Sequence, residues 1–180
     1  MQLALIYGTQ LGNTEEVAEK IIEQFQADYE FELVDVNDIR AENLNDWEFV
    51  ICGIPTWDIG QLEYGWSDLY DDLDNVEINT SIAMFGLGDQ GGYPETYQDA
   101  MGILYKKLIE RGANGCIGFT STSGHSFEKS EAIIDDKFCG LALDEDQQHD
   151  LTEIRIEEWA NDIKKHLSSL LNNKKCVHQE

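Results

Sequence analysis

Short runs of consecutive apolar residues alternate along the chain with segments whose apolar residues recur every three or four positions. Unbroken apolar runs are typical of strands buried on both faces, and the three- and four-residue spacing is typical of amphipathic helices. This pattern predicts strands at residues 3–7, 31–36, 49–54, 81–87, 116–119 and 141–143, and helices at about 14–25, 66–73, 97–108 and 152–170. Strands that alternate with helices form a parallel sheet with helices on both faces, so we predict an α/β fold.

One polar segment interrupts this alternation. Residues 121–138 have no helical period and separate two short strand pieces, so we expect a long loop inserted into the last strand. A chain of 180 residues without internal repeats or linkers has the length of one domain. We therefore predict one domain over residues 1–171, with an insertion at about 120–139, and a flexible C-terminal tail over residues 172–180.

The charge of the chain is strongly negative. It has 36 acidic and 12 basic residues, a net charge of −24, and 22 of the acids lie in the first 100 residues beside only two bases, Lys20 and Arg40. Nucleic-acid binding needs basic patches, and anionic membrane surfaces repel such a chain, so we expect neither partner. The acids form either a solvated surface or an interaction face.

Cysteine and histidine usage favours a cytoplasmic protein without a metal site. The four cysteines are widely spaced and the four histidines form no metal-ligand pattern, which indicates reduced thiols. No basic segment precedes the first apolar run, so we expect no signal peptide. No apolar stretch approaches the ~20 residues of a membrane helix, so we expect no membrane insertion.

The loop that follows the first predicted strand has the composition of a phosphate site. Gly8–Thr14 brings two hydroxyls and side-chain amides to the start of a helix, where backbone N–H groups and the helix dipole attract anions. The loop matches neither the G-x-x-x-x-G-K-[ST] nor the G-x-G-x-x-G pattern, so a phosphomonoester fits it best. An ordinary turn rich in glycine and threonine explains this loop alone equally well.

Two later loops offer aromatic faces for a planar ligand. Pro55 ends the third strand, so we expect Trp57 to project beyond the sheet edge. In the loop at 88–95, Asp89 can accept a hydrogen bond and Tyr93 offers a second ring. Parallel sheets bind ligands at the carboxyl ends of their strands, so these loops meet at one place. Together they suit a flat ring on a phosphorylated chain.

Three motifs resemble the FMN-binding loops of flavodoxins: Gly8-Thr9-Gln10-x-Gly12-x-Thr14, Pro55-Thr56-Trp57-x-x-Gly60 and Gly86-x-Gly88-Asp89-Gln90-x-Gly92-Tyr93. The segment 140–146 resembles the one that follows the insertion in long-chain flavodoxins. The resemblance covers about residues 2–170. It implies a flavodoxin-like three-layer sandwich, with a five-stranded parallel sheet, helices on both faces and a last strand interrupted by the insertion.

The resemblance implies that the protein binds FMN tightly and without a covalent bond. The residues implied to hold the phosphate are Thr9, Gln10, Gly12, Asn13 and Thr14, and Leu11 stands in the same loop where the family usually has Thr or Ser. Trp57 and Tyr93 are implied to sandwich the isoalloxazine ring. The other implied ring contacts are Thr56, Asp58, Ile59, Gly60, Gly88 and Asp89, and Asp146 is implied to reach the ribityl chain.

The same resemblance implies a function. The protein is expected to be a low-potential one-electron carrier, not an enzyme, that uses the semiquinone/hydroquinone couple of FMN, with a turn of the Asp58–Ile59 peptide as its redox switch. We expect a monomer whose partners present basic docking faces, such as a ferredoxin/flavodoxin-NADP reductase, photosystem I, a 2-oxoacid oxidoreductase or nitrogenase reductase. The acidic surface would disfavour the negative charge that FMN gains on full reduction.

Two other functions remain open from the sequence. An FMN-dependent quinone or azo reductase on the same fold needs an open substrate cavity, which a sandwich of Trp57 and Tyr93 would oppose. A regulatory module that has lost its cofactor is supported only by Leu11.

Overall fold

The computed structural model describes residues 1–177, and it describes side chains as far as Ser169. Its helices are α1 (Asn13–Phe25), α2 (Tyr64–Asp72), α3 (Asp99–Glu110) and α4 (Thr152–Val177), with short 3-10 turns η1 (Val36–Asp38), η2 (Ala41–Asp46), η3 (Leu73–Asn75) and η4 (His149–Leu151). Its main strands are β1 (Leu3–Tyr7), β2 (Glu32–Asp35), β3 (Phe49–Trp57), β5 (Ser81–Leu87) and β10 (Leu141–Leu143). The alternation of strands and helices agrees with the sequence pattern.

The central sheet has the strand order β10-β5-β3-β1-β2, and these five strands pair in parallel. Two short strands extend it: β4 (Gln61–Leu62) pairs antiparallel with β3, and β6 (Cys116–Ile117) pairs parallel with β5. The chain leaves β1 toward β2 on one side and continues through β3 on the other. The strand order therefore reverses between β1 and β3, which is the point where such sheets bind ligands.

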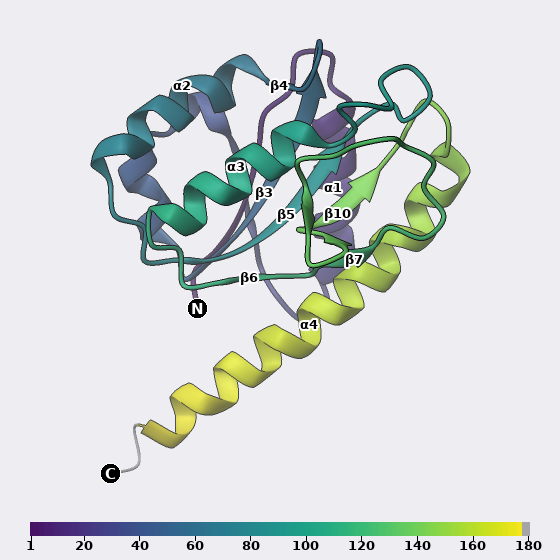
Figure 1. Ribbon diagram of the computed structural model, residues 1–180. Coiled ribbons are helices and arrows are strands. Elements are labelled where there is room, and N and C mark those ends of the chain that lie inside the picture. Colours follow the sequence, from purple (N-terminus) through teal and green to yellow (C-terminus); the bar gives the residue numbers. More distant parts are fainter. Residues whose placement is uncertain (178–180) are drawn as a thin grey trace.

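Helices cover both faces of the sheet, as expected (Figure 1). On one face, α1 and α4 pack over apolar side chains such as Leu5, Ile51 and Phe85. On the other face, α2 and α3 pack over side chains such as Ile6 and Val50. Side chains alternate along each strand and therefore pack into two apolar cores, one on each face of the sheet. This explains why the strands are unbroken apolar runs in the sequence. The predicted three-layer α/β sandwich is confirmed.

The insertion separates two strands that pair with the same neighbour. Both β6 and β10 bond to β5, at Ile82–Ala83 and Phe85–Leu87 respectively. The segment between them was expected to be a loop, but it contains a small antiparallel sheet of order β7-β9-β8, built from Thr120–Ser121, Lys137–Phe138 and Ile133–Ile134. Strands of two residues are too short to show an alternating pattern in the sequence.

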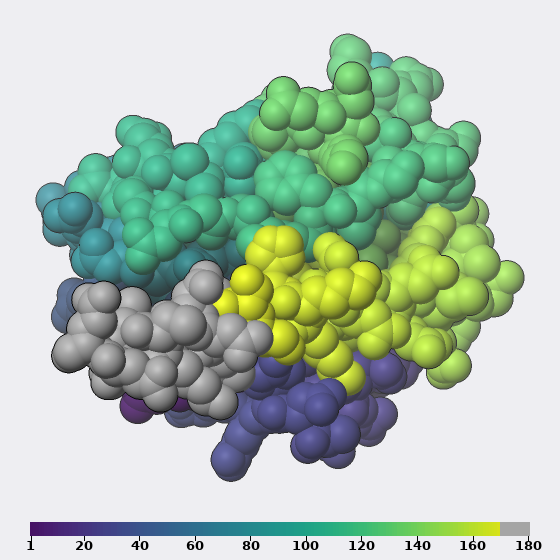
Figure 2. Space-filling view, turned by 90° about the horizontal axis from the view of Figure 1, so that it is seen from below, coloured from purple at the N-terminus to yellow at the C-terminus, as the bar shows by residue number. Residues whose placement is uncertain are grey.

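The C-terminal helix extends further than the domain boundary expected from the sequence. α4 continues to Val177, past residue 171, because no glycine or proline follows Thr152 to end it. The predicted tail therefore starts as helix, and residues 178–180 lie outside the described residues. Seen from below, α4 lies between purple N-terminal segments and the green segments that contain α3 and the insertion (Figure 2). No helix among residues 1–177 is long and apolar enough to span a bilayer.

Candidate functional site

The first loop leaves the N-terminus of α1 open to a ligand. Gly12 precedes the helix with a φ of 91°, a conformation that glycine adopts without strain. The N–H of Gly12 donates to Oγ1 of Thr9 at 2.9 Å, which closes the loop on itself. No side chain within the described residues caps this helix. The N–H groups of its first turn are therefore available to an anion, because they have no partner within the helix.

Close packing beneath the first loop joins it to β3. The N–H of Gly8 donates to the carbonyl of Gly53 at 3.1 Å, and the indole Nε1 of Trp66 donates to the same carbonyl at 2.8 Å. A Cβ on Gly8 would lie 2.5 Å from both Trp66 Cδ1 and Glu63 Oε2. Gly8 is thus required for the loop to approach α2, and this contact fixes the first loop relative to the second.

The second loop is the tip of the hairpin between β3 and β4, in which Trp57 pairs with Gln61. Three residues, Asp58–Gly60, make the tip, and both Asp58 and Gly60 have positive φ, at 44° and 86°. Trp57 is half-buried, and the side chain of Ile59 is 78% exposed. The hairpin therefore carries an indole and a carboxylate to the carboxyl end of the sheet.

The third loop is held by two carboxylates. Oδ1 of Asp89 accepts the N–H groups of Gly91 and Gly92 at 2.9 and 2.8 Å, which folds the loop around that side chain. Asp144, at the end of β10, is fully buried, and its Oδ2 accepts the N–H of Gln90 at 3.0 Å while its Oδ1 accepts the N–H groups of the two residues after Glu145. Asp144 thus brings the segment after β10 against the third loop.

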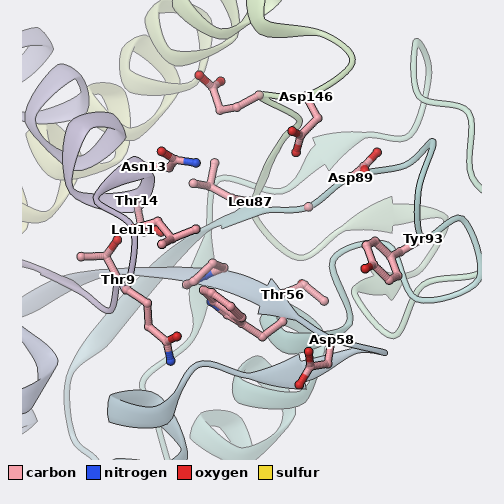
Figure 3. A pocket seen from close by; sticks show the side chains of 15 residues that line it. Thr9, Leu11, Asn13, Thr14, Thr56, Asp58, Leu87, Asp89, Tyr93 and Asp146 are labelled. Atoms are coloured by element: carbon pink, nitrogen blue, oxygen red, sulfur yellow. The ribbon is translucent and has the colours of Figure 1, made fainter.

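These loops surround one cavity of about 340 Å³ at the carboxyl ends of the strands (Figure 3). In Figure 3, side chains of the first loop, including Thr9 and Leu11, stand on one side, and Asp89 and Tyr93 stand on the other. Eleven of the fourteen site residues predicted from the sequence line the cavity: Thr9, Gln10, Leu11, Asn13, Thr14, Thr56, Trp57, Asp58, Gly88, Asp89 and Tyr93.

Three predicted residues do not line it. Gly12 shapes the first loop, Ile59 points into solvent, and Gly60 is buried against the start of α3. The lining also includes Pro55, Leu87 and Glu145, which the sequence analysis did not select, and Asp146. Pro55 and Leu87 lie at the ends of two apolar runs, and this position in the sequence indicates that they are close to the ligand-binding end of the sheet. Glu145 lies in the segment 140–146 that carries part of the resemblance, but its place at the cavity depends on the bond of the neighbouring Asp144 to Gln90, far away in the sequence.

The mouth of the cavity is strongly acidic. Burial, followed by the neighbouring charges of Asp89, Asp144 and Glu145, raises the pKa of Asp146 above its ordinary value. Beside the first loop, burial and a hydrogen bond from its hydroxyl to Glu15 raise the pKa of Tyr7 to about 12. The side chains around the cavity therefore oppose additional negative charge, whereas the N-terminus of α1 attracts it.

The structure offers neither a reactive thiol at Cys52 nor a metal cluster among the described residues. Burial raises the pKa of Cys52 to about 12, so this thiol stays protonated and is a poor nucleophile. Among the described residues, no cluster of His, Cys, Asp and Glu has the arrangement of a metal site. The cavity can bind an anionic, planar molecule, and its lining offers hydrogen bonds and aromatic faces.

Comparisons with known proteins agree with this geometry. The family model described as flavodoxin matches residues 5–159. A flavodoxin of Nostoc sp. is 46% identical over 164 residues, which are 91% of this chain and 95% of the relative. Flavodoxin 1 of Escherichia coli is 37% identical and covers 93% of this chain and 97% of its own.

A solved structure shows the same fold. The crystal structure of Fusobacterium nucleatum flavodoxin bound to flavin mononucleotide superposes with a TM-score of 0.86 at 28% identity, covering 92% of this chain and 98% of the other. The family match spans most of the chain, includes all three loops, and confirms the resemblance that they carry. Together, the loops, the parallel sheet and the relatives show that the chain belongs to the flavodoxin family, whose members are electron-transfer proteins rather than enzymes.

Proposed function

We propose that the protein carries single electrons between larger redox proteins on FMN bound non-covalently in the cavity of the three loops. The observation that carries this proposal is the convergence of an uncapped helix N-terminus and two aromatic side chains on one cavity. The cavity lies at the switch point of a doubly wound parallel sheet, a rule for which flavodoxins are themselves a standard example. The family does not favour the quinone or azo reductase alternative.

One feature of the cavity supports FMN as its ligand independently of the relatives. The hydroxyl of Thr56 is buried at the cavity wall and has no hydrogen-bond partner among the described residues. A buried, unpartnered hydroxyl is costly, so its presence indicates that a polar ligand atom completes it. The ring of FMN carries carbonyl and nitrogen atoms that can do so. The Fusobacterium relative was solved with this cofactor bound.

Different loops would hold different parts of the cofactor. The first loop would bind the phosphate through backbone N–H groups at the start of α1 and the hydroxyls of Thr9 and Thr14. Trp57 and Tyr93 would contact the ring, because they are the aromatic side chains of the cavity lining. When bound, FMN supplies one-electron redox chemistry that no side chain of the cavity can supply.

The protein's own contribution is to place negative charge around the cofactor. Asp58, Asp89, Glu145 and Asp146 line the cavity, and the whole chain has a net charge of −24. Each ionised carboxylate opposes electron addition to the cofactor, which lowers its midpoint potential. The same charge attracts partners with basic docking faces and accelerates their association at low salt.

Apolar side chains at the cavity mouth suit direct contact with a partner. Leu11 and Ile59 are each 78% exposed and Tyr93 is 50% exposed, and one belongs to each of the three loops. A partner surface with an apolar centre and a basic rim would complement them. We propose that its partners are reductases and low-potential electron donors or acceptors of the kinds that the sequence resemblance implies. We further propose that the protein works as one domain, as a monomer and in the cytoplasm, where thiols such as Cys52 stay reduced.

The experiment that tests this function is a reductive titration of the purified protein. A carrier should copurify with FMN or bind it when added, accept electrons in two separated one-electron steps from a chemical reductant, and keep its flavin colour when NAD(P)H alone is added. Bleaching by NAD(P)H alone would instead indicate a reductase. Failure to bind added FMN would exclude the function.

A further inference from the structure

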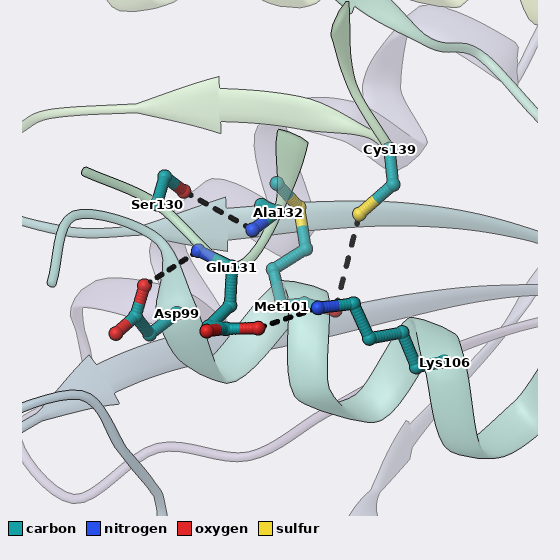
Figure 4. A network of polar contacts seen from close by, with 7 residues as sticks. All are labelled: Asp99, Met101, Lys106, Ser130, Glu131, Ala132 and Cys139. Carbon is teal, nitrogen blue, oxygen red and sulfur yellow. Dashed lines mark hydrogen bonds and ion pairs between the residues drawn. The ribbon is translucent and has the colours of Figure 1, made fainter. Parts of the chain in front are cut away.

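The carboxylate of Asp99 lies between the tip of the second loop and the insertion. Its Oδ1 accepts the N–H of Glu131 at 2.7 Å (Figure 4). Its Oδ2 faces Gly60, because a Cβ on Gly60 would lie 2.8 Å from that oxygen. The same Cβ would lie 3.3 Å from Cβ of Thr96, so Gly60 rests directly on the segment that begins α3. One side chain therefore bonds to the insertion and lies next to Gly60, two segments that are about 70 positions apart in the sequence.

The insertion is firmly seated where Asp99 meets it. A Cβ on Gly102 would lie 2.2 Å from the carbonyl carbon of Glu131, so the insertion backbone lies directly on α3. Within the insertion, the N–H of Cys139 donates to the carbonyl of Ala132 at 2.9 Å. Glu131 pairs with Lys106 of α3 (Figure 4). Asp99 is thus held from the insertion side by a fixed backbone donor.

The hairpin tip is positioned by what lies behind Gly60. Trp57 and Asp58 line the cavity, and only two residues separate Trp57 from Gly60. Gly60 itself is buried and does not line the cavity. A shift of Gly60 toward or away from α3 therefore moves the indole and the carboxylate that face the ligand.

The carboxylate at this place has an energetic cost. Burial is the largest cause of a raised pKa for Asp99, and the bond from the N–H of Glu131 offsets only part of it. An amide of the same shape would avoid the cost of the charge, so charge and contact geometry can be separated by substitution.

We propose that Asp99 is a positioning residue for electron transfer: its two carboxylate oxygens join the insertion to Gly60 and thereby set where Trp57 and Asp58 stand in the cavity. The insertion then forms part of the support of the second loop through this one side chain. The proposal rests on the proposed binding of FMN for its redox consequence, whereas the contact itself belongs to the protein alone.

Three variants separate the contact from the charge. Asp99→Ala removes both the charge and the contact. Asp99→Asn removes the charge and keeps an acceptor for the N–H of Glu131. The matched control, Glu95→Gln, removes one exposed charge from the neighbouring third loop.

The first measurement is made by NMR on the protein without added FMN. In Asp99→Ala, we expect the amide of Glu131 to exchange at least tenfold faster and the order parameters of Ile59 and Gly60 to fall. In Asp99→Asn and Glu95→Gln, we expect these quantities to stay near those of the unmodified protein. Unchanged order parameters at 59–60 in Asp99→Ala would overturn the proposal.

The second measurement is the pair of one-electron midpoint potentials of the FMN-loaded protein. Asp99→Asn and Glu95→Gln should shift both potentials by similar amounts. Asp99→Ala should shift at least one of them further, by a threefold change in the equilibrium constant or about 30 mV. Equal potentials in all three variants would overturn the proposal. If Asp99→Ala does not fold, Asp99→Ser replaces it in both measurements. Failure of the unmodified protein to bind FMN would exclude the proposed function, and the first measurement would still test the contact.

Discussion

The acidic mouth of the cavity should lower the midpoint potential of bound FMN, and Asp146→Asn tests this directly. Asp146 lines the cavity, and burial, followed by the charges of Asp89, Asp144 and Glu145, raises its pKa above the ordinary value. Its backbone N–H, not its carboxylate, bonds to Asp144, so the substitution removes a charge and keeps that bond. A change in potential can therefore be assigned to charge.

The magnitude follows from Coulomb's law. A unit charge at about 10 Å, with an effective dielectric constant of about 40 for a half-solvated site, contributes about 0.8 kcal/mol, or about 35 mV for one electron. We expect Asp146→Asn to raise the potential of the step that adds negative charge by roughly this amount at low salt. At 0.5 M salt the shift should shrink, because the screening length falls well below 10 Å.

The assay is a spectroelectrochemical titration at about 10 mM and 500 mM salt, with Glu110→Gln as the matched control. Glu110 is the last residue of α3 and is exposed. Because α3 runs away from the cavity, this charge lies toward the opposite ends of the strands. A shift in Asp146→Asn that is no larger than in Glu110→Gln, or that does not respond to salt, would refute the reasoning.

Three further predictions concern single side chains. Leu11→Thr should tighten FMN binding about tenfold in a fluorescence titration, since a hydroxyl bonded to a phosphate contributes roughly 1.5 kcal/mol; weaker binding would place Leu11 in a favourable apolar contact. Burial and the charge of Arg155 lower the pKa of His125 to about 4. Between about pH 6.5 and pH 4, this histidine is therefore protonated in the unfolded chain and neutral in the folded one, so the free energy of unfolding decreases as the pH is lowered. His125→Gln should reduce this loss by about 1–2 kcal/mol in urea titrations, allowing for the partial exposure of the ring; identical curves would contradict it. Gly102→Ala should destabilise the protein by about 1–3 kcal/mol, although alanine normally stabilises a helix interior by about 1 kcal/mol, because its Cβ would meet the backbone of Glu131; a gain in stability would show that the insertion is not seated on α3.

The insertion has a more definite place in the molecule than its polar sequence indicates. Its backbone at Glu131 lies on Gly102 of α3. The N–H of Ser126 bonds to the side chain of Gln90, and the N–H groups of Glu128 and Lys129 bond to the carbonyl of Pro94. These contacts reach the third loop, whereas Asp99 reaches the second. The insertion is therefore connected to two of the three loops that surround the cavity.

Local sequence patterns determine much of the fold and of the site. The unbroken apolar runs, such as Leu3–Tyr7, identify strands because a parallel strand is buried on both faces, and the three loops follow from glycine, proline and aromatic residues at the ends of those runs. Eleven predicted site residues line the cavity because the carboxyl ends of parallel strands share one edge.

Tertiary structure alone decided the rest. The sequence could not show that β6 and β10 both pair with β5, that Glu145 reaches the cavity through the buried bonds of Asp144, or that Gly60 turns away from the cavity onto Asp99. Each of these depends on contacts between residues that are tens of positions apart. Local periodicity records only which face of an element is buried, and the partner of that face is chosen by the packing of the whole chain.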